Sequence, residues 1–169
     1  VNAGSNGISG LLVFSSGTTS KGNSGSISIG SGQAATGAGG LVSITVGSGN
    51  KNAGGAISIV AGSSTQTGTT GQGGSLRLTA GSGAGATGGA ISMIAGEGKA
   101  TTSGSIVVKT VNAGTNGISG GLVFSTGTTT KGDSGTIAIG SGLATGGHGG
   151  SISLTVGNGN TNSGGDIVI

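Results

Sequence analysis

The residues that could carry acid–base chemistry in this chain are few and widely separated. There is one histidine, His148, and the acidic residues are Glu97, Asp133 and Asp166. A catalytic histidine needs a partner acid, base or nucleophile, and Asp133, fifteen residues before His148, is the carboxylate best spaced to pair with it. We interpret both side chains as belonging to solvated turns, with a His148–Asp133 pair as the alternative.

Other chemical motifs are equally sparse. A metal site needs several His, Cys or carboxylate ligands together, and no such cluster occurs in the sequence. The stretch GEGKA at 96–100 resembles the end of a phosphate-binding loop, but it lacks the following Ser/Thr and the spaced upstream glycine. We therefore expect no catalytic, cofactor-binding or metal-binding residue, no cofactor, and no enzymatic activity.

Composition excludes several classes of protein. The net charge of +3 comes from six scattered basic residues, and the aromatic residues are Phe14 and Phe124. Nucleic-acid binding requires clustered Lys/Arg, usually with stacking aromatics, so we expect no nucleic-acid partner. No apolar run approaches the roughly 18 residues that a membrane helix needs, so no membrane span is expected. Cysteine is absent, which excludes a disulfide framework.

The chain is built from short tandem repeats, each beginning at what we call the leading glycine. Successive leading glycines are mostly fifteen residues apart, with longer intervals after Gly55 and Gly104. The complete set is Gly10, Gly25, Gly40, Gly55, Gly74, Gly89, Gly104, Gly120, Gly135, Gly150 and Gly165. Two and four residues after each one stand two apolar residues, the aliphatic pair, for example Ile27 and Ile29. Such regular placement argues against a disordered chain despite the 45 glycines.

Alternation with a period of two is typical of a β-strand. Two aliphatic side chains supply roughly 3–6 kcal/mol on burial, whereas ordering fifteen residues costs roughly 15–30 kcal/mol of backbone entropy. A single unit therefore cannot fold alone, and stacking of identical units is the natural compensation. The sequence predicts an all-β fold, a thin parallel β-solenoid (β-helix) with one unit of about 15 residues per coil. The aliphatic pairs, such as Ile57 and Ile59 or Ile137 and Ile139, are expected to form continuous buried columns.

Two further positions of the repeat suggest local conformations. A second glycine follows the leading glycine by seven residues in nearly every unit, at Gly17, Gly32, Gly47, Gly62, Gly81, Gly96, Gly127, Gly142 and Gly157. We expect this second glycine to form a tight corner with positive φ. Lys21, Lys51 and Lys131 share one position, eleven residues after the leading glycine, and are expected at an exposed bend.

A longer repeat is superimposed on the short one. Residues 111–169 match residues 1–59 at 40 of 59 positions. We therefore divide the chain into a first super-repeat of seven coils, residues 1–110, and a partial second one, residues 111–169, in one continuous solenoid without a linker. The chain stops at Ile169 within an aliphatic pair, so we expect it to be a segment of a longer repetitive polypeptide or a unit that stacks end to end.

The units of the form GGxISIxxGSG resemble the glycine- and serine-rich tandem repeats of large surface or extracellular proteins of algae and other microbes. The resemblance implies a structural role outside the cell or at its surface. We expect a non-enzymatic segment of a long repetitive protein that assembles with itself into an extracellular fibre, sheath or adhesive thread. The alternative is a binding protein whose regular face, with small outward residues such as Ser28, Ser43 and Ser58, binds ice or a polysaccharide.

Overall fold

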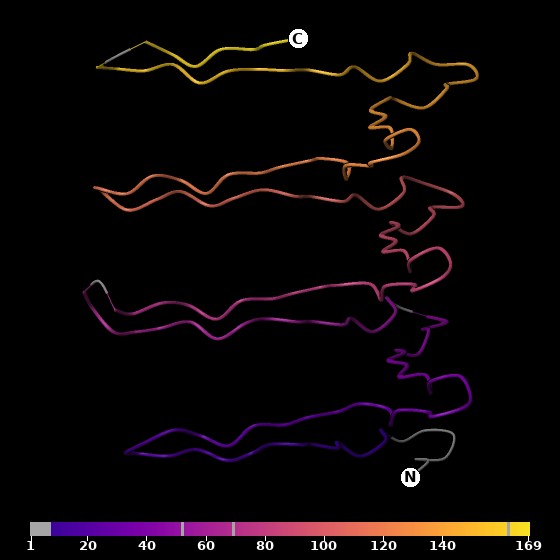
Figure 1. Ribbon diagram of the computed structural model, residues 1–169, viewed down its shortest axis with the longest axis vertical. Helices are drawn as coiled ribbons and strands as arrows, with labels where there is room; N and C mark the ends of the chain where they lie inside the picture. The colour runs from indigo at the N-terminus through magenta and orange to yellow at the C-terminus, as the bar shows by residue number, and fades with distance from the viewer. Residues whose placement is uncertain (1–7, 52, 69, 162) are drawn as a thin grey trace. The chain divides into compact units, whose positions relative to one another are not determined.

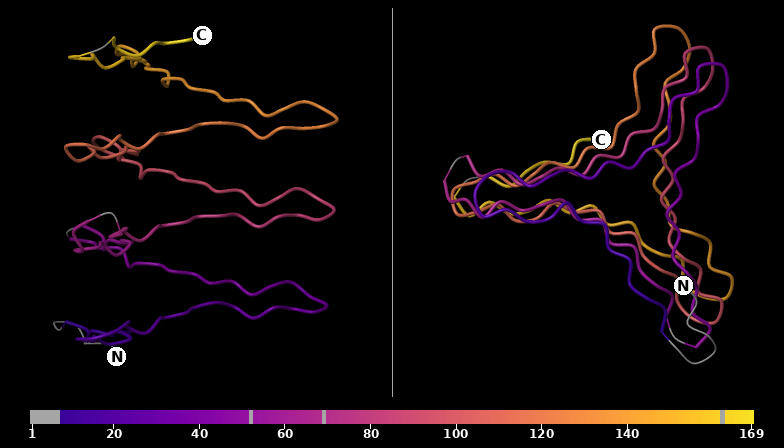
Figure 2. Two further views of the ribbon diagram at one scale, coloured as in Figure 1. Left: turned by 60° about the vertical axis from the view of Figure 1, so that its left-hand side comes forward. Right: turned by 90° about the horizontal axis from the view of Figure 1, so that it is seen from below.

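Residues 8–51, 53–68, 70–161 and 163–169 are described in the computed structural model of the chain. These residues contain neither a helix nor a β-strand; the backbone runs as extended segments separated by bends. The chain divides into two units, Val1–Thr79 and Ala80–Ile169. Figures 1 and 2 show that, inside each unit, the chain repeatedly runs out and doubles back on itself.

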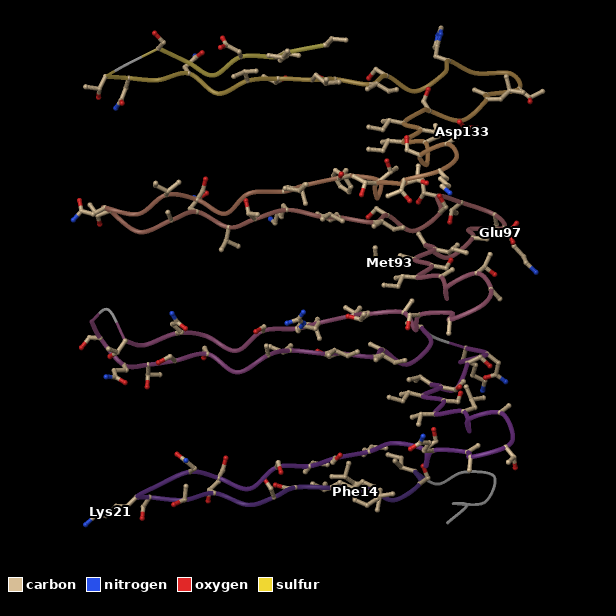
Figure 3. All side chains as sticks on the ribbon, viewed as in Figure 1. Phe14, Lys21, Met93, Glu97 and Asp133 are labelled. Carbon is tan, nitrogen blue, oxygen red and sulfur yellow. The ribbon has the colours of Figure 1, made fainter. Side chains whose placement is uncertain are left out.

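The bends follow the sequence repeat. Every interval between two leading glycines contains one bend or turn, which begins ten to thirteen residues after the first of the two glycines. In the described residues they lie at 20–22, 35–37, 50–51, 68 and 70, 84–86, 99–101, 115–116, 130–132, 145–147 and 160–161. Lys21, Lys51 and Lys131 all lie in bends and are exposed, which confirms the expected position of these lysines. Figure 3 shows Lys21 at the tip of one such excursion.

Each bend brings the next leading glycine back against the preceding segment. The Gly89 N–H donates a hydrogen bond to the Gly81 carbonyl at 2.9 Å, and the Gly104 N–H donates to the Gly96 carbonyl at the same distance. The same bond joins Gly74 to Gly62 at 2.8 Å. In these units, and in the one that begins at Gly55, the leading glycine is thus bonded to the second glycine of the unit before it. Consecutive extended segments therefore run in opposite directions where they meet.

The prediction of an all-β parallel β-solenoid, or parallel β-helix, is wrong for the described residues. A strand requires a ladder of successive backbone hydrogen bonds to a neighbour. Here the two sides of a bend are joined by an isolated bond between two glycines, such as Gly89 to Gly81. The repeat is therefore not a closed coil stacked on the next coil. It is an extended segment and a bend, after which the chain turns back.

The predicted buried columns are also absent, because no hydrophobic side chain among the described residues is buried. Ile57 is 54% exposed and Ile59 is 64% exposed. Alternation is visible as a difference in exposure in some repeats: Ile106 of an aliphatic pair is 54% exposed, whereas the adjacent Val107 is 74% exposed. In most pairs the first member is about half covered and the second is more exposed.

The prediction of a tight corner at the second glycine is wrong, because none of the nine lies in a bend, and the expected positive φ is found only at Gly17. The other positive values fall mostly within the bends themselves, at Gly22, Gly68, Gly132 and Gly146. In four units the carbonyl of the second glycine accepts a hydrogen bond from the next leading glycine, at Gly47, Gly62, Gly81 and Gly96. A Cβ at any of the nine second glycines would meet open space, so crowding does not explain why glycine recurs there.

Candidate functional site

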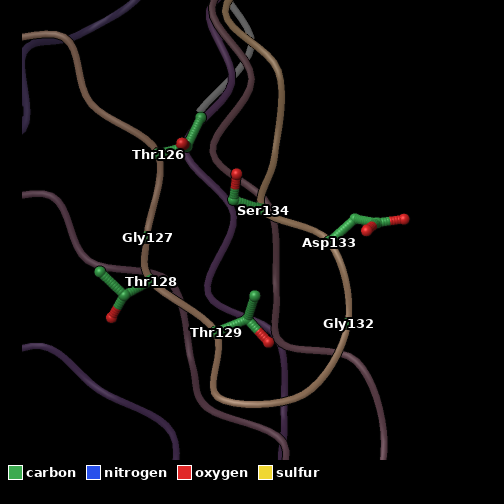
Figure 4. Close-up of a pocket in the computed structure, with 7 residues that line it drawn as sticks. All are labelled: Thr126, Gly127, Thr128, Thr129, Gly132, Asp133 and Ser134. Atoms are coloured by element: carbon green, nitrogen blue, oxygen red, sulfur yellow. The ribbon is translucent and has the colours of Figure 1, made fainter.

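A shallow polar hollow surrounds the bend at 130–132. Its volume is about 650 Å³, and its lining consists of Thr126, Gly127, Thr128, Thr129, Gly132, Asp133 and Ser134. We call this segment, residues 126–134, the hydroxyl bend. Figure 4 shows that the Thr129 side chain turns into the bend, whereas the Asp133 carboxylate points away from it.

Local hydrogen bonding and a left-handed glycine fix the hydroxyl bend. The Thr129 hydroxyl donates to the Lys131 carbonyl at 3.2 Å, and Gly132 has a φ of 114°. That φ is readily available to glycine and strained for residues with a Cβ. The side chain of Thr129 thus satisfies a backbone acceptor that a bend leaves without a partner.

The corresponding bend in the first super-repeat, at 20–22, has the same geometry with a slightly different sequence. The Thr19 hydroxyl donates to the Lys21 carbonyl at 3.1 Å, and Gly22 has a φ of 112°. Asn23 occupies the place that Asp133 has in the second copy. The bend therefore forms in both sequence contexts, and its charge differs between them.

The hydroxyl bend provides hydrogen-bonding hydroxyls and one exposed carboxylate, Asp133. Asp133 and His148 are both exposed, and no hydrogen bond links them among the described residues, so the structure does not bring this candidate pair together. Glu97 and Asp166 are likewise exposed, and the described part of the chain holds no group of three or more His, Cys, Asp or Glu suited to a metal ion. The hydroxyl bend can donate and accept hydrogen bonds to a polyol, and little more.

The sequence interpretation did not single out this hollow. A signal for it exists in the strings SGTTSKGNS at 16–24 and TGTTTKGDS at 126–134, which keep two adjacent threonines before a lysine and a glycine. A second hollow, of about 470 Å³, is lined by Lys109, Thr110, Val111 and Asn112. It joins a single cation to two polar residues and one apolar one, and no chemistry follows from it.

The exposed apolar face is the most extensive chemical feature of the chain. In ten of the eleven aliphatic pairs one member is about half exposed, as at Ile106 with 54% and Ile137 with 51%; in the first pair Leu12 and Phe14 are both more exposed. Surface patches of this kind on a soluble chain commonly mark an interaction surface. Within the described residues, no helix is long and apolar enough to cross a membrane.

Comparison with known proteins adds no assignment, because no protein-family model, curated protein or solved structure matches the chain.

Proposed function

We propose that this protein is a non-enzymatic, self-associating structural protein that builds an extracellular fibre, sheath or adhesive thread. The observation that carries the proposal is the apolar face that every repeat leaves exposed. The accessible surface of the chain is 16598 Å², more than twice the roughly 7,000 Å² expected for a compact monomer of this mass. A standard interface takes only about 800 Å² from each partner, so a single chain offers surface for many contacts.

Regular spacing makes another copy of the same chain the fitting partner. The aliphatic pair recurs in all eleven units at constant positions after the leading glycine, so one contact between two chains can be repeated along their length. The 169 residues carry only nine formal charges, and electrostatic repulsion between copies is correspondingly small. Cooperative lateral or end-to-end assembly follows from repeating one weak contact many times.

The test compares two sets of substitutions within residues 80–169. The first replaces Ile91, Ile106 and Ile137 of the aliphatic pairs with serine; all three are about half exposed. Covering the exposed half of one isoleucine is worth about 1 kcal/mol, so the triple variant should raise the concentration at half-assembly by roughly a hundredfold. Sedimentation velocity over a concentration series, with electron microscopy of the same samples, gives this value.

The control set replaces Ile94, Val107 and Leu143 with serine. These side chains are more exposed than the first set but do not belong to the repeated pairs. We expect their loss to shift assembly by no more than a few-fold. An equal effect of the two sets would mean that any exposed apolar group serves, and a parent chain that stays monomeric at all concentrations would overturn the proposal.

Polysaccharide binding is the second candidate, and the hydroxyl bend is the observation that favours it. Its threonine and serine hydroxyls line a hollow of about 650 Å³, large enough for a sugar ring. Binding of soluble polysaccharides to a non-associating variant, measured by calorimetry, tests this alternative. Ice binding also stays a prediction, and measuring thermal hysteresis would test it directly.

A further inference from the structure

Two asparagine–glycine sequences lie in very different local structures. The chain has ten asparagines, and three precede a glycine: Asn6, Asn116 and Asn158. Asn6 lies outside the described residues. An asparagine before glycine is prone to attack by the glycine backbone nitrogen on the side-chain amide carbon, because glycine has no Cβ to obstruct the approach.

The first described pair, Asn116–Gly117, is held in a β-turn. The Gly117 N–H donates to the Gly114 carbonyl at 3.1 Å, the bond that closes a four-residue turn. The backbone nitrogen that would attack is therefore engaged. This hydrogen bond must be broken before Gly117 can react with its neighbour.

The second pair, Asn158–Gly159, stands in an exposed extended segment just before the bend at 160–161. Among the described residues, the Gly159 N–H makes no backbone hydrogen bond comparable to that of Gly117. The corresponding residues in the first super-repeat are Ser48 and Gly49. The second copy thus has a reactive pair where the first copy has an inert one.

We propose that Asn158 is a site of spontaneous deamidation, and that the structure makes it react faster than Asn116. The Gly159 nitrogen loses its proton to solvent and bonds to Cγ of Asn158. Nδ2 takes up a proton from solvent, the bond from Cγ to Nδ2 breaks, and the side-chain nitrogen leaves as ammonia. Water then opens the resulting succinimide at either carbonyl. The products are aspartate at 158 or an isoaspartyl link, and no oxidant or reductant is required.

The isoaspartyl product would alter the contact across the bend at 160–161. A Cβ placed on Gly164 would lie 3.0 Å from the Gly157 carbonyl oxygen and 3.9 Å from both Asn158 Cα and the Gly159 nitrogen. The backbone at 157–159 therefore passes close to Gly164. An isoaspartyl link lengthens that backbone by one atom and shifts residue 157 relative to Gly164, and either product adds a negative charge.

The experiment follows each site separately in the full chain. The protein is incubated at mildly alkaline pH, and peptide mapping by mass spectrometry quantifies conversion at 116 and 158, with isoaspartate detected by a methyltransferase label. The net free energy of the hydrogen bond donated by Gly117 corresponds to about a fivefold difference in rate, so Asn158 should react about five times faster than Asn116. In denaturant, where the turn is lost, the two rates should become equal.

Two variants sharpen the interpretation. Asn158→Ser, the residue found in the first copy, should abolish reaction at this position, and Gly159→Ala should slow it by crowding the attacking nitrogen. Equal rates at 116 and 158 in native buffer would overturn the proposal, as would an Asn158 that stays intact natively but reacts in denaturant. Neither outcome depends on whether the protein associates with itself, so the test is independent of the proposed function.

Discussion

Introduced cysteines should report directly on the doubling back of the chain at each bend. A Cβ placed on Gly89 lies 3.4 Å from the Ala80 Cβ, close to the Cβ–Cβ separation of about 3.8 Å in a disulfide. The chain has no cysteine of its own, so the double variant Ala80→Cys, Gly89→Cys contains a single possible intramolecular pair. We expect this pair to oxidise readily, because the bend at 84–86 already holds the two positions together.

The magnitude follows from the size of the loop. Closing a loop of about ten residues by a disulfide removes chain entropy worth about 2.7 kcal/mol, which is close to a hundredfold change in an equilibrium constant. Because the folded chain already closes this bend, forming the disulfide in it avoids much of that entropy cost. The variant should therefore form its disulfide at a glutathione ratio roughly a hundredfold more reducing than an unstructured chain of the same length would need.

The assay is a redox titration with thiol alkylation and mass spectrometry at low protein concentration. The matched control is Ala80→Cys with Gly88→Cys, since a Cβ on Gly88 lies within 4 Å of the Gly81 carbonyl oxygen alone. The two loops differ by one residue, and their chain entropies are nearly the same. Equal titration midpoints for the two variants would refute the arrangement of this bend, as would faster crosslinking of Ile91→Cys with Ile106→Cys, which follow the fifteen-residue period.

Two glycine substitutions give further predictions. Gly132→Ala should destabilise its bend by about 1–3 kcal/mol, because alanine is strained at a φ of 114° although the space is open. Gly142→Ala, also in open space but without a positive φ, should be neutral or stabilising by up to about 1 kcal/mol. Hydrogen exchange and NMR chemical shifts around each site measure the difference, and equal effects of the two substitutions would contradict it. Gly55→Ala places a methyl group on Val46 Cγ1, so it should disturb the bend at 50–51, and adding Val46→Ala should restore the bend. If the effects of the two substitutions simply add in a double-mutant cycle on the same observables, this contact is contradicted.

The sequence correctly predicts the bends that contain the shared lysine position, although it wrongly places a tight corner at the second glycine. The leading glycines and the shared lysine position mark the repeat, and Lys21, Lys51 and Lys131 lie in bends as expected. This success has a local cause. Bends depend on glycine, serine and threonine within a few residues of one another, and that information is contained in a short stretch of sequence.

Pairing of extended segments is not local, and here the sequence interpretation was wrong. A period of two in Ile27 and Ile29 shows which side chains share a face, but not which segment, if any, lies beside them. Stacking of units and doubling back at bends both satisfy the same alternation. The feature that distinguishes the two arrangements is the hydrogen bond from a leading glycine to the preceding second glycine. Where this bond forms, the two glycines are in most cases eight residues apart. Nothing in the spacing of the glycines distinguishes that bond from a corner in a coil.

Differences between the two super-repeats separate what holds a bend from what can vary within it. Thr129, Lys131 and Gly132 repeat Thr19, Lys21 and Gly22 without change, and they provide the hydroxyl-to-carbonyl bond and the left-handed glycine in both copies. The flanking residues change from asparagine to aspartate at 23 and 133, and from serine to asparagine at 48 and 158. Charge and reactivity therefore vary beside the bends, while the apolar character of each aliphatic pair is kept in every unit. No apolar side chain among the described residues is buried, so a core does not account for this constancy, which supports the proposed role of the apolar face in contact between chains.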